Sequence, residues 1–297
     1  MTTANMGTTI RQKYNRLRIR RVSRQSQLHT PYPYTNYPSL LDRLTTLKTI
    51  LDTGKSVSRF GDGELMLALL GRSIPFQQKN RELALQLSHV LNTPDPRVLV
   101  CMNNTFMQNA TIPWLLDYER SKKDYASYES IRKTDDIGIL LRAKEQRFYN
   151  ECYRILFGRN VPDTFGDATV FMLGLYCNEY RSDQIDEVKA LFLKMLAGKK
   201  LLIASPAKPL MEPSLQSLAG RLKQAGVTNL QWVDIPENNA YAHYSTIKSS
   251  ILCAGGFDAV WIQGGPTATL LAHDLAIHHD ILAYDIGSFN TTLQYLI

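Results

Sequence analysis

Apolar and polar positions along this chain follow two patterns that alternate. Short runs rich in Val, Ile, Leu and aromatic residues, bounded by Gly, Pro, Asn or Asp, are typical of buried strands, and the amphipathic stretches between them are typical of helices. Strands that alternate with helices pair in parallel, so we predict an α/β fold with a doubly wound, mostly parallel, Rossmann-like sheet. The predicted strands are residues 56–60, 97–102, 199–205, 230–236, 257–263 and 280–287.

The same pattern divides the chain into an arm and one domain. Residues 1–38 combine a basic stretch with a Pro- and Tyr-rich linker, and residues 39–297 are predicted to form a single α/β domain. Ser39 is expected to cap a helix that Gly54 ends. Residues 106–160 are mostly helical in pattern and rich in Arg, Lys and Tyr, so we expect a helical insertion there. The run at 167–176 is ambiguous between strand and helix.

Two carboxylates stand where the first predicted strand passes into a helix. Asp62 lies between Gly61 and Gly63, and Glu64 begins a helical run. Ligands of open α/β sheets bind at this edge, outside the carboxyl ends of the strands. The two residues are either ligands or acidic residues of a first helical turn, where the macrodipole favours negative charge. A second Asp-x-Glu, at 117–119, lies in a glycine-free helical run and is interpreted as a solvated helix face.

A second candidate is the segment 263–269, which ends one strand and starts a helix. Its two glycines allow a tight turn, and Pro266 suits a first helical turn. Thr267 and Thr269 add hydroxyls beside free backbone N–H groups, where anions such as phosphate bind. The segment has no Gly-Lys-Ser/Thr, so it is not a Walker loop, and a plain capped turn remains the alternative.

Polar residues also follow other predicted strands. Asn103 follows the strand at 97–102, and Asn239 either contacts a base or ribose or caps the next helix. Asp285 is either a ligand at the sheet edge or a turn former. The histidines form no metal-spaced set with cysteine, and the absence of Gly-x-Ser-x-Gly leaves acyl transfer without support.

Composition narrows the class of protein. With 44% hydrophobic and 21% charged residues, the 297-residue chain has an ordinary globular composition. No apolar run approaches the ~20 residues that span a bilayer, and no signal-peptide pattern is visible. The four cysteines are widely spaced, so we expect reduced thiols packed as small hydrophobes in a cytoplasmic protein.

The net charge of +7 is concentrated in the N-terminal arm. Residues 1–41 hold seven Arg or Lys and no Asp or Glu, and the remaining 27 basic residues balance 27 acidic ones. The domain therefore has no basic surplus for nucleic acid. The cations at 11–24 form either a solvated tail or a peripheral contact with an anionic membrane, which would be the inner face.

Taken together, these motifs resemble the glycosyltransferases of the GT-D fold, a bacterial family whose hallmark is an Asp-x-Glu metal motif. The resemblance covers about residues 40–290. The segments that carry it are SVSRFGDGE at 56–64, SIPFQ at 73–77, NNAY at 238–241, GGPTATLLAHDL at 264–275 and AYDIG at 283–287.

The resemblance implies an enzyme of polysaccharide or related biosynthesis that uses a nucleotide-sugar donor, commonly UDP-glucose, with Mn²⁺ or Mg²⁺. A hexose would move to a glycan, glycoprotein or lipid-linked acceptor. The resemblance also implies that Asp62 and Glu64 hold the metal and that Asp285 joins them in catalysis. The donor contacts that it implies are Arg59, Gly61, Gln77, Asn103, Asn239, Gly265, Thr267 and Thr269.

Three segments depart from the family pattern. SPAKPLMEP at 205–213 replaces a glycine-containing loop, Val170-Phe171-Met172 replaces a Ser/Thr-Arg pair, and Ser288 replaces a histidine. These departures keep open a non-catalytic sugar- or nucleotide-binding partner in a glycosylation complex. A metal-dependent phosphohydrolase is the other alternative, although it would need several Asp and His around two metals, and only one carboxylate pair has a suitable context.

Overall fold

A computed structural model describes residues 38–103, 161–172, 182–206 and 213–287. All of them belong to one compact unit formed by residues 38–104 and 159–297. The basic arm and the predicted helical insertion lie outside the described residues. Within the described part, no helix is long and apolar enough to cross a bilayer.

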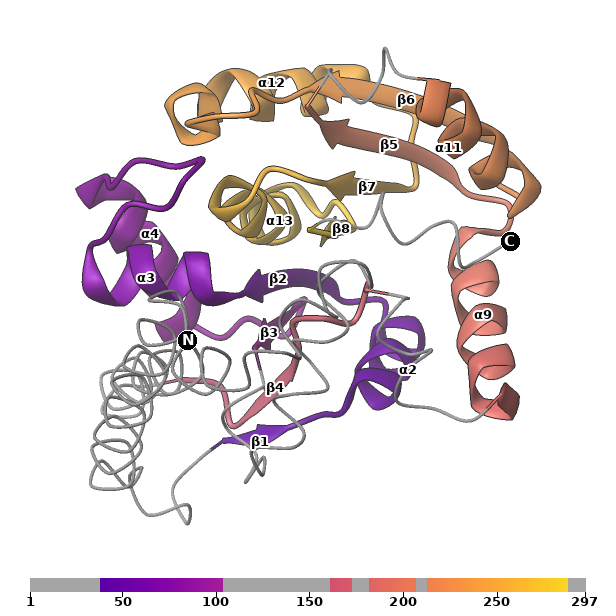
Figure 1. The fold of residues 1–297 in the computed structure, drawn as a ribbon, viewed down its shortest axis with the longest axis horizontal. Helices are drawn as coiled ribbons and strands as arrows, with labels where there is room; N and C mark the ends of the chain where they lie inside the picture. The colour runs from indigo at the N-terminus through magenta and orange to yellow at the C-terminus, as the bar shows by residue number, and fades with distance from the viewer. Residues whose placement is uncertain (1–37, 104–160, 173–181, 207–212, 288–297) are drawn as a thin grey trace, which may run out of the picture. The chain divides into compact units, whose positions relative to one another are not determined.

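The described part contains an eight-stranded sheet in which every pair of neighbouring strands is parallel (Figure 1). Across the sheet the strand order is β1-β4-β3-β2-β8-β7-β5-β6. This confirms the predicted α/β fold with a doubly wound parallel sheet. The strands are β1 (Ser39–Leu40), β2 (Ser56–Phe60), β3 (Val98–Met102), β4 (Thr164–Asp167), β5 (Lys200–Ser205), β6 (Asn229–Asp234), β7 (Ala259–Ile262) and β8 (Ala283–Asp285).

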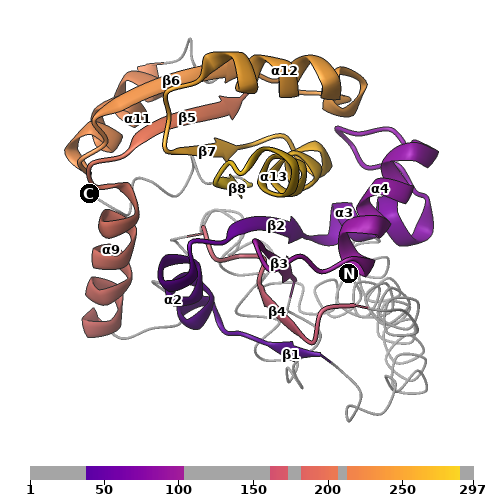
Figure 2. The same cartoon turned by 180° about the vertical axis from the view of Figure 1, so that it is seen from behind.

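Helices cover both faces of this sheet, and the direction of each connection decides the face. Helices in connections that lead to a strand nearer β6 pack on one face of the sheet, and helices in connections that lead to a strand nearer β1 pack on the other face (Figure 2). This is the arrangement expected when all crossover connections between parallel strands have the same hand. The first group is α2 (Arg43–Thr53), α9 (Ser182–Leu196) and α11 (Pro213–Gln224). The second is α3 (Asp62–Leu70) and α4 (Arg81–Asn92), α12 (Tyr244–Ala254) and α13 (Pro266–His279).

An aromatic cluster in the core explains one departure from the family pattern. The ring of Phe171 lies 5.8 Å from that of Tyr284 and 6.4 Å from those of Phe192 and Trp261, measured between centroids. Val170 and Phe171 are both 0% exposed. In the ambiguous run, Asp167 is the last residue of β4, and residues 168–171 form a turn after it. Apolar residues at 170 and 171 therefore serve the core beneath β7 and β8.

Two sequence-based expectations were wrong in detail. Ser39 does not cap α2 but pairs with Thr164 in β1, and the cap is Asp42, whose carboxylate accepts a hydrogen bond from Thr45 N at 2.8 Å. Gly54 ends α2 as expected, with a left-handed φ of 63°. Cys101 is buried as predicted, but Cys253 is exposed, because it lies in the last turn of α12.

Candidate functional site

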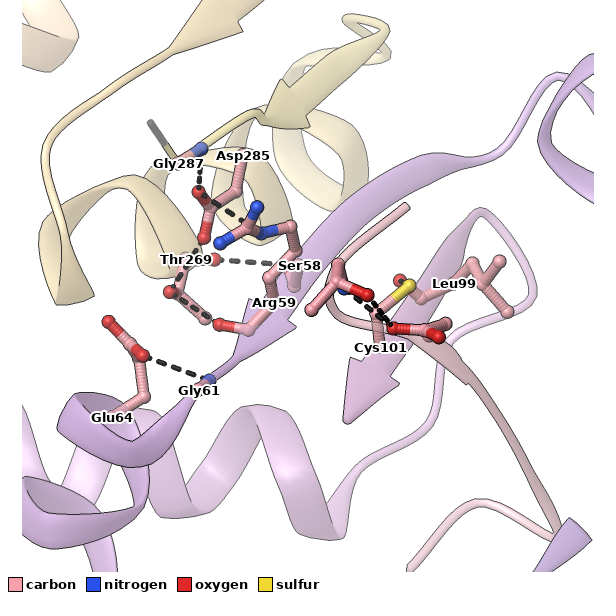
Figure 3. Close-up of polar contacts among 11 residues, drawn as sticks. Ser58, Arg59, Gly61, Glu64, Leu99, Cys101, Thr269, Asp285 and Gly287 are labelled. Carbon is pink, nitrogen blue, oxygen red and sulfur yellow. Dashed lines mark hydrogen bonds and ion pairs between the residues drawn. The ribbon is translucent and has the colours of Figure 1, made fainter. Parts of the chain in front are cut away.

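The candidate residues converge at the carboxyl edge of the central strands. Arg59 comes from β2, Glu64 from the start of α3, Thr269 from α13 and Asp285 from the end of β8 (Figure 3). Because β2 and β8 are neighbours in the sheet, residues more than 200 positions apart in sequence meet there. Two hydrogen bonds tie α13 to β2: Ser58 Oγ donates to Thr269 O, and Thr269 Oγ1 donates to Arg59 O, both at 3.0 Å.

The Asp-x-Glu motif forms the first turn of α3. Gly61 is the N-cap, and its backbone N–H donates to Glu64 Oε2 at 3.0 Å. The predicted capping role is therefore real for Glu64, but it occupies only one carboxylate oxygen. Asp62, the first helical residue, is exposed. Both carboxylates also gain from the positive end of the helix dipole, and a capping role does not prevent ligand binding by the remaining oxygens.

Asp285 is a buried carboxylate, 3% exposed. Its Oδ2 is 3.0 Å from Thr269 Oγ1, and its Oδ1 accepts a hydrogen bond from Gly287 N at 3.1 Å. Thr269 is itself 0% exposed, and its single hydroxyl proton is shared between Asp285 and Arg59 O. These contacts hold the carboxylate of Asp285 in one orientation at the end of the central strand.

Arg59 supplies the positive charge of the cluster. Its Nε lies 3.8 Å from Asp285 Oδ1, close enough for an ion pair but too far for a hydrogen bond. Among the described residues, neither Nε nor Nη1 of Arg59 has a hydrogen-bond partner, although both atoms are buried. Gly287 has a left-handed φ of 53°, and a Cβ built there would collide with the guanidinium. The backbone therefore passes directly over a cation that still has N–H groups to donate.

The electrostatics favour a positive ligand beside Glu64. Burial of its carboxylate and repulsion by Asp285 raise the pKa of Glu64 from 4.5 to about 7. Burial also raises the pKa of Asp285, against the opposing effects of Arg59 and of the hydrogen bonds from Thr269 and Gly287. Two carboxylates that resist ionisation together are stabilised when a cation binds between them.

The carboxylate oxygens at this site suit a hard divalent ion that a substrate also binds. Carboxylate oxygens are the ligands that Mg²⁺ and Mn²⁺ prefer, and Mg²⁺ often uses one or two carboxylates plus substrate phosphates. In the described ranges no group of three or more His, Cys, Asp or Glu residues is arranged to hold a metal ion without such help. Glu64, with Asp62 or Asp285, therefore fits an ion that a diphosphate also binds.

The N-terminus of α13 borders this cluster. Thr267 is 0% exposed, and its hydroxyl has no hydrogen-bond partner among the described residues. The hydroxyl of Ser205, at the end of β5, is likewise buried and unpaired within this part of the chain. Because β5 and β7 are adjacent but lead to helices on opposite faces, they flank a topological switch point, where ligands of α/β sheets bind. Sequence reasoning missed Ser205, although its position at the end of a predicted strand was a usable signal.

The amides of Gln77 and Asn239 are engaged within the protein. Gln77 is 5% exposed, and its side chain bonds Gln78 O and Tyr241 N. Asn239 Oδ1 accepts from Gln78 N at 2.8 Å instead of capping the short 3₁₀ helix Ala240–His243. Both side chains thus tie the loop between α3 and α4 to the loop after β6.

Two other residues that were predicted to contact the sugar donor take part in the fold through their backbone. Asn103 is buried, and its N–H donates to Phe60 O at 3.0 Å. Gly265 is the N-cap of α13 and has a left-handed φ of 53°, a conformation that glycine adopts without strain. Ser288 and most of the 205–213 segment lie outside the described residues.

Comparisons with known proteins point to glycosyltransferases. The family model described as the glycosyltransferase GT-D fold matches residues 57–137, a range that includes Asp62 and Glu64. A relative named probable glycosyl transferase Gly, from Streptococcus gordonii, is 22% identical over 258 residues, which cover 86% of this chain. The matched region makes up 33% of that relative, so the chain spans about one third of its length.

Solved structures share the fold. One, reported as a highly conserved domain of unknown function 1792 with a distinct glycosyltransferase fold, has a TM-score of 0.62 and 24% identity, with 88% of this chain and 82% of that chain covered. Another, reported as a new glycosyltransferase from Streptococcus sanguinis, has a TM-score of 0.63 and 23% identity over 87% of this chain and 84% of that one.

Proposed function

Because this chain has the GT-D fold of glycosyltransferases, we propose that it transfers a hexose from a nucleotide-sugar donor such as a UDP-sugar. A glycan, a glycoprotein or a lipid-linked molecule would be the acceptor. The observation that carries this proposal is the cluster of Glu64, Asp285 and Arg59 beside the N-terminus of α13. It combines acidic groups for a divalent ion with positive groups for a diphosphate.

Each part of the cluster has a task in such a transfer. When bound, Mn²⁺ or Mg²⁺ would neutralise negative charge on the departing nucleoside diphosphate, with Asp62 and Glu64 as its protein ligands. The backbone N–H of Thr267, at the positive end of the α13 dipole, would bind a phosphate oxygen. Arg59 would donate its unpaired N–H groups to the same diphosphate.

Interactions between charges should stabilise the transition state more than neutral hydrogen bonds do. One unit charge at ~4 Å contributes about 4 kcal/mol at an effective dielectric near 20. That energy corresponds to roughly a thousandfold in rate. A neutral hydrogen bond contributes only ~1 kcal/mol net, so loss of a carboxylate should lower the rate of transfer far more than loss of a hydroxyl.

The decisive experiment is a donor-hydrolysis and binding assay over a panel of nucleotide sugars, with Mn²⁺ and with a chelator. We expect hydrolysis of at least one donor that depends on the metal. Donor binding without any turnover, in the presence of acceptor extracts, would favour a non-catalytic partner. Absence of binding by every nucleotide sugar would contradict the proposal.

Thr267→Val tests the phosphate end of the site. Valine keeps the shape of the buried side chain and removes a hydroxyl that has no partner in the described part of the protein. We expect KM for the donor to rise by a factor of about 10–150, since one hydrogen bond to a charged group contributes roughly 1.5–3 kcal/mol. Steady-state kinetics at varied donor concentration measure this change.

The matched control for Thr267→Val is Thr49→Val on α2, where the hydroxyl bonds only a carbonyl of its own helix. Its donor KM should stay at the wild-type value. If Thr267→Val also leaves donor kinetics unchanged, the hydroxyl does not contact the donor, and the segment 263–269 acts as a structural turn.

A further inference from the structure

The loop between α3 and α4 carries an aromatic side chain that the proposed metal and phosphate contacts leave unexplained. Phe76 is 44% exposed, one of few large hydrophobic side chains with that exposure in the described part. The solvent-exposed part of the ring contributes no burial free energy to the fold.

The backbone around Phe76 is fixed from two sides. Ile74 and Gln77 form an antiparallel bridge within the loop. Across the gap to the loop after β6, Asn239 N donates to Phe76 O, and Asn239 Oδ1 accepts from Gln78 N, each at 2.8 Å. Asn239 adopts a left-handed φ of 52° to make both bonds, a conformation that is uncommon outside glycine. The position of the ring is thus set by protein contacts before any ligand binds.

One side of the ring lies against the N-cap of α13. A Cβ built on Gly265 would be 2.6 Å from Phe76 Cε2 and 3.3 Å from Cδ2, so only glycine leaves room for the ring. The ring therefore borders the same helix start that presents Thr267.

The strand order places the ring at one end of the site. Glu64 and Asp285 follow β2 and β8, Gly265 follows β7, and the loop of Asn239 follows β6 at the far edge. Since Phe76 contacts Gly265 and bonds Asn239, it lies on the side of the α13 N-terminus that is opposite to the carboxylates. A diphosphate held between the carboxylates and α13 would direct one of its two substituents toward this ring.

We propose that Phe76, supported by Gly265, is a stacking platform for the nucleobase of the donor. This inference rests on the proposed use of a nucleoside diphosphate sugar. The base is the flat aromatic part of such a donor, and base–aromatic stacking tolerates different bases because each has a π-face. The sugar to be transferred then lies on the carboxylate side, where the bond is broken.

Binding measurements with fragments of the donor test the platform. Calorimetric titration of the full chain with UDP, GDP and inorganic pyrophosphate, each with Mn²⁺, would compare the wild type with Phe76→Leu and Phe76→Trp. We expect Phe76→Leu to weaken both nucleotides by roughly ten- to hundredfold and to leave pyrophosphate affinity unchanged. Phe76→Trp should retain nucleotide affinity because it keeps a π-face.

Leu85→Ala is the matched control, because Leu85 is 61% exposed on α4, outside the loop that carries Phe76. Its affinities should equal those of the wild type. Equal weakening of nucleotides and pyrophosphate by Phe76→Leu would mean that the ring only supports the loop, and would overturn the inference. Unchanged nucleotide affinity would also overturn it, as would weakening seen only with an intact nucleotide sugar.

The outcomes separate this inference from the function on which it rests. A wild-type protein that binds UDP or GDP, with a Phe76→Leu variant that binds equally well, refutes the platform and leaves the proposed function standing. A wild-type protein that binds no nucleotide and no nucleotide sugar refutes both.

Discussion

Glu64→Gln is expected to reduce metal-dependent turnover by about a thousandfold or more while the protein remains folded. The substitution removes a negative charge that, at ~4 Å and an effective dielectric near 20, gains about 4 kcal/mol for each unit of positive charge on a bound ion. Glutamine retains a side-chain oxygen that can accept the hydrogen bond from Gly61 N, so the cap of α3 is kept. Turnover of the donor at saturating Mn²⁺ measures the loss, and circular dichroism reports the fold.

The same variant should unfold at a higher temperature than the metal-free wild type at pH 8. The pKa of Glu64 is raised from 4.5 to about 7 in the folded protein. The stability that its protonated form contributes is therefore fully present below pH 4.5 and is lost as pH rises through about 7. Glutamine cannot ionise, so it escapes a cost on the order of 1–3 kcal/mol above pH 7. Thermal denaturation should show a smaller difference in melting temperature between the variant and the metal-free wild type at pH 5 than at pH 8.

Glu187→Gln is the matched control for Glu64→Gln. Glu187 pairs with Lys48 on the surface, where both side chains are more than 40% exposed, and such pairs contribute little. We expect no change in turnover and almost none in melting temperature at either pH. The metal assignment fails if both Glu64→Gln and Asp62→Asn turn over donor at the wild-type rate.

Arg59→Gln is expected to lower kcat/KM at pH 7 by at least about a hundredfold. The guanidinium lowers the pKa of both Glu64 and Asp285, so its removal should raise both values further. Fewer molecules would then carry the ionised carboxylates. The diphosphate of the nucleotide sugar would also lose a charged hydrogen-bonding partner worth ~2–3 kcal/mol. The acidic limb of the pH–rate profile should move to higher pH, which a purely structural defect would not cause.

Two further variants decide what Arg59 contributes. Arg59→Lys keeps the charge and loses the fork of N–H groups, so it should preserve the position of the acidic limb but recover only part of kcat/KM. Arg97→Gln is the control, since Arg97 pairs with Asp95 before β3, at the opposite edge of the sheet. An unchanged pH profile in Arg59→Gln would show that the guanidinium does not tune the carboxylates.

The alternation of apolar and polar segments was enough to predict the parallel sheet. Buried runs such as 98–102 and 201–204 are apolar at every position, because helices cover both faces of a parallel strand. Errors arose where local signals compete. Ser39 and Asp42 are both good capping residues, and only pairing with β4 decides that Ser39 is in a strand. The strand at Thr164–Asp167 includes a polar residue at each end and escaped notice.

For the site, glycine context singled out the turn where β2 passes into α3, but the sequence could not reveal which residues lie beside that turn. The proximity of Arg59 and Asp285 depends on β8 entering the sheet beside β2, and no local pattern encodes strand order. The contact of Phe76 with Gly265 is equally nonlocal. By contrast, Asn239 misled in a different way, because asparagine suits caps, turns and left-handed positions alike, and only the fold selects among them.

The position of β8 has a consequence for protein synthesis. It is the last of the described strands to leave the ribosome, yet it pairs with β2 on one side and β7 on the other. Until residues 283–285 emerge, the strands before them can form only two separate half-sheets, each with an open edge ready for wrong partners. Chaperone demand should therefore peak late in translation, and ribosome stalling shortly before residue 283 should yield aggregates rather than a partly folded, soluble domain.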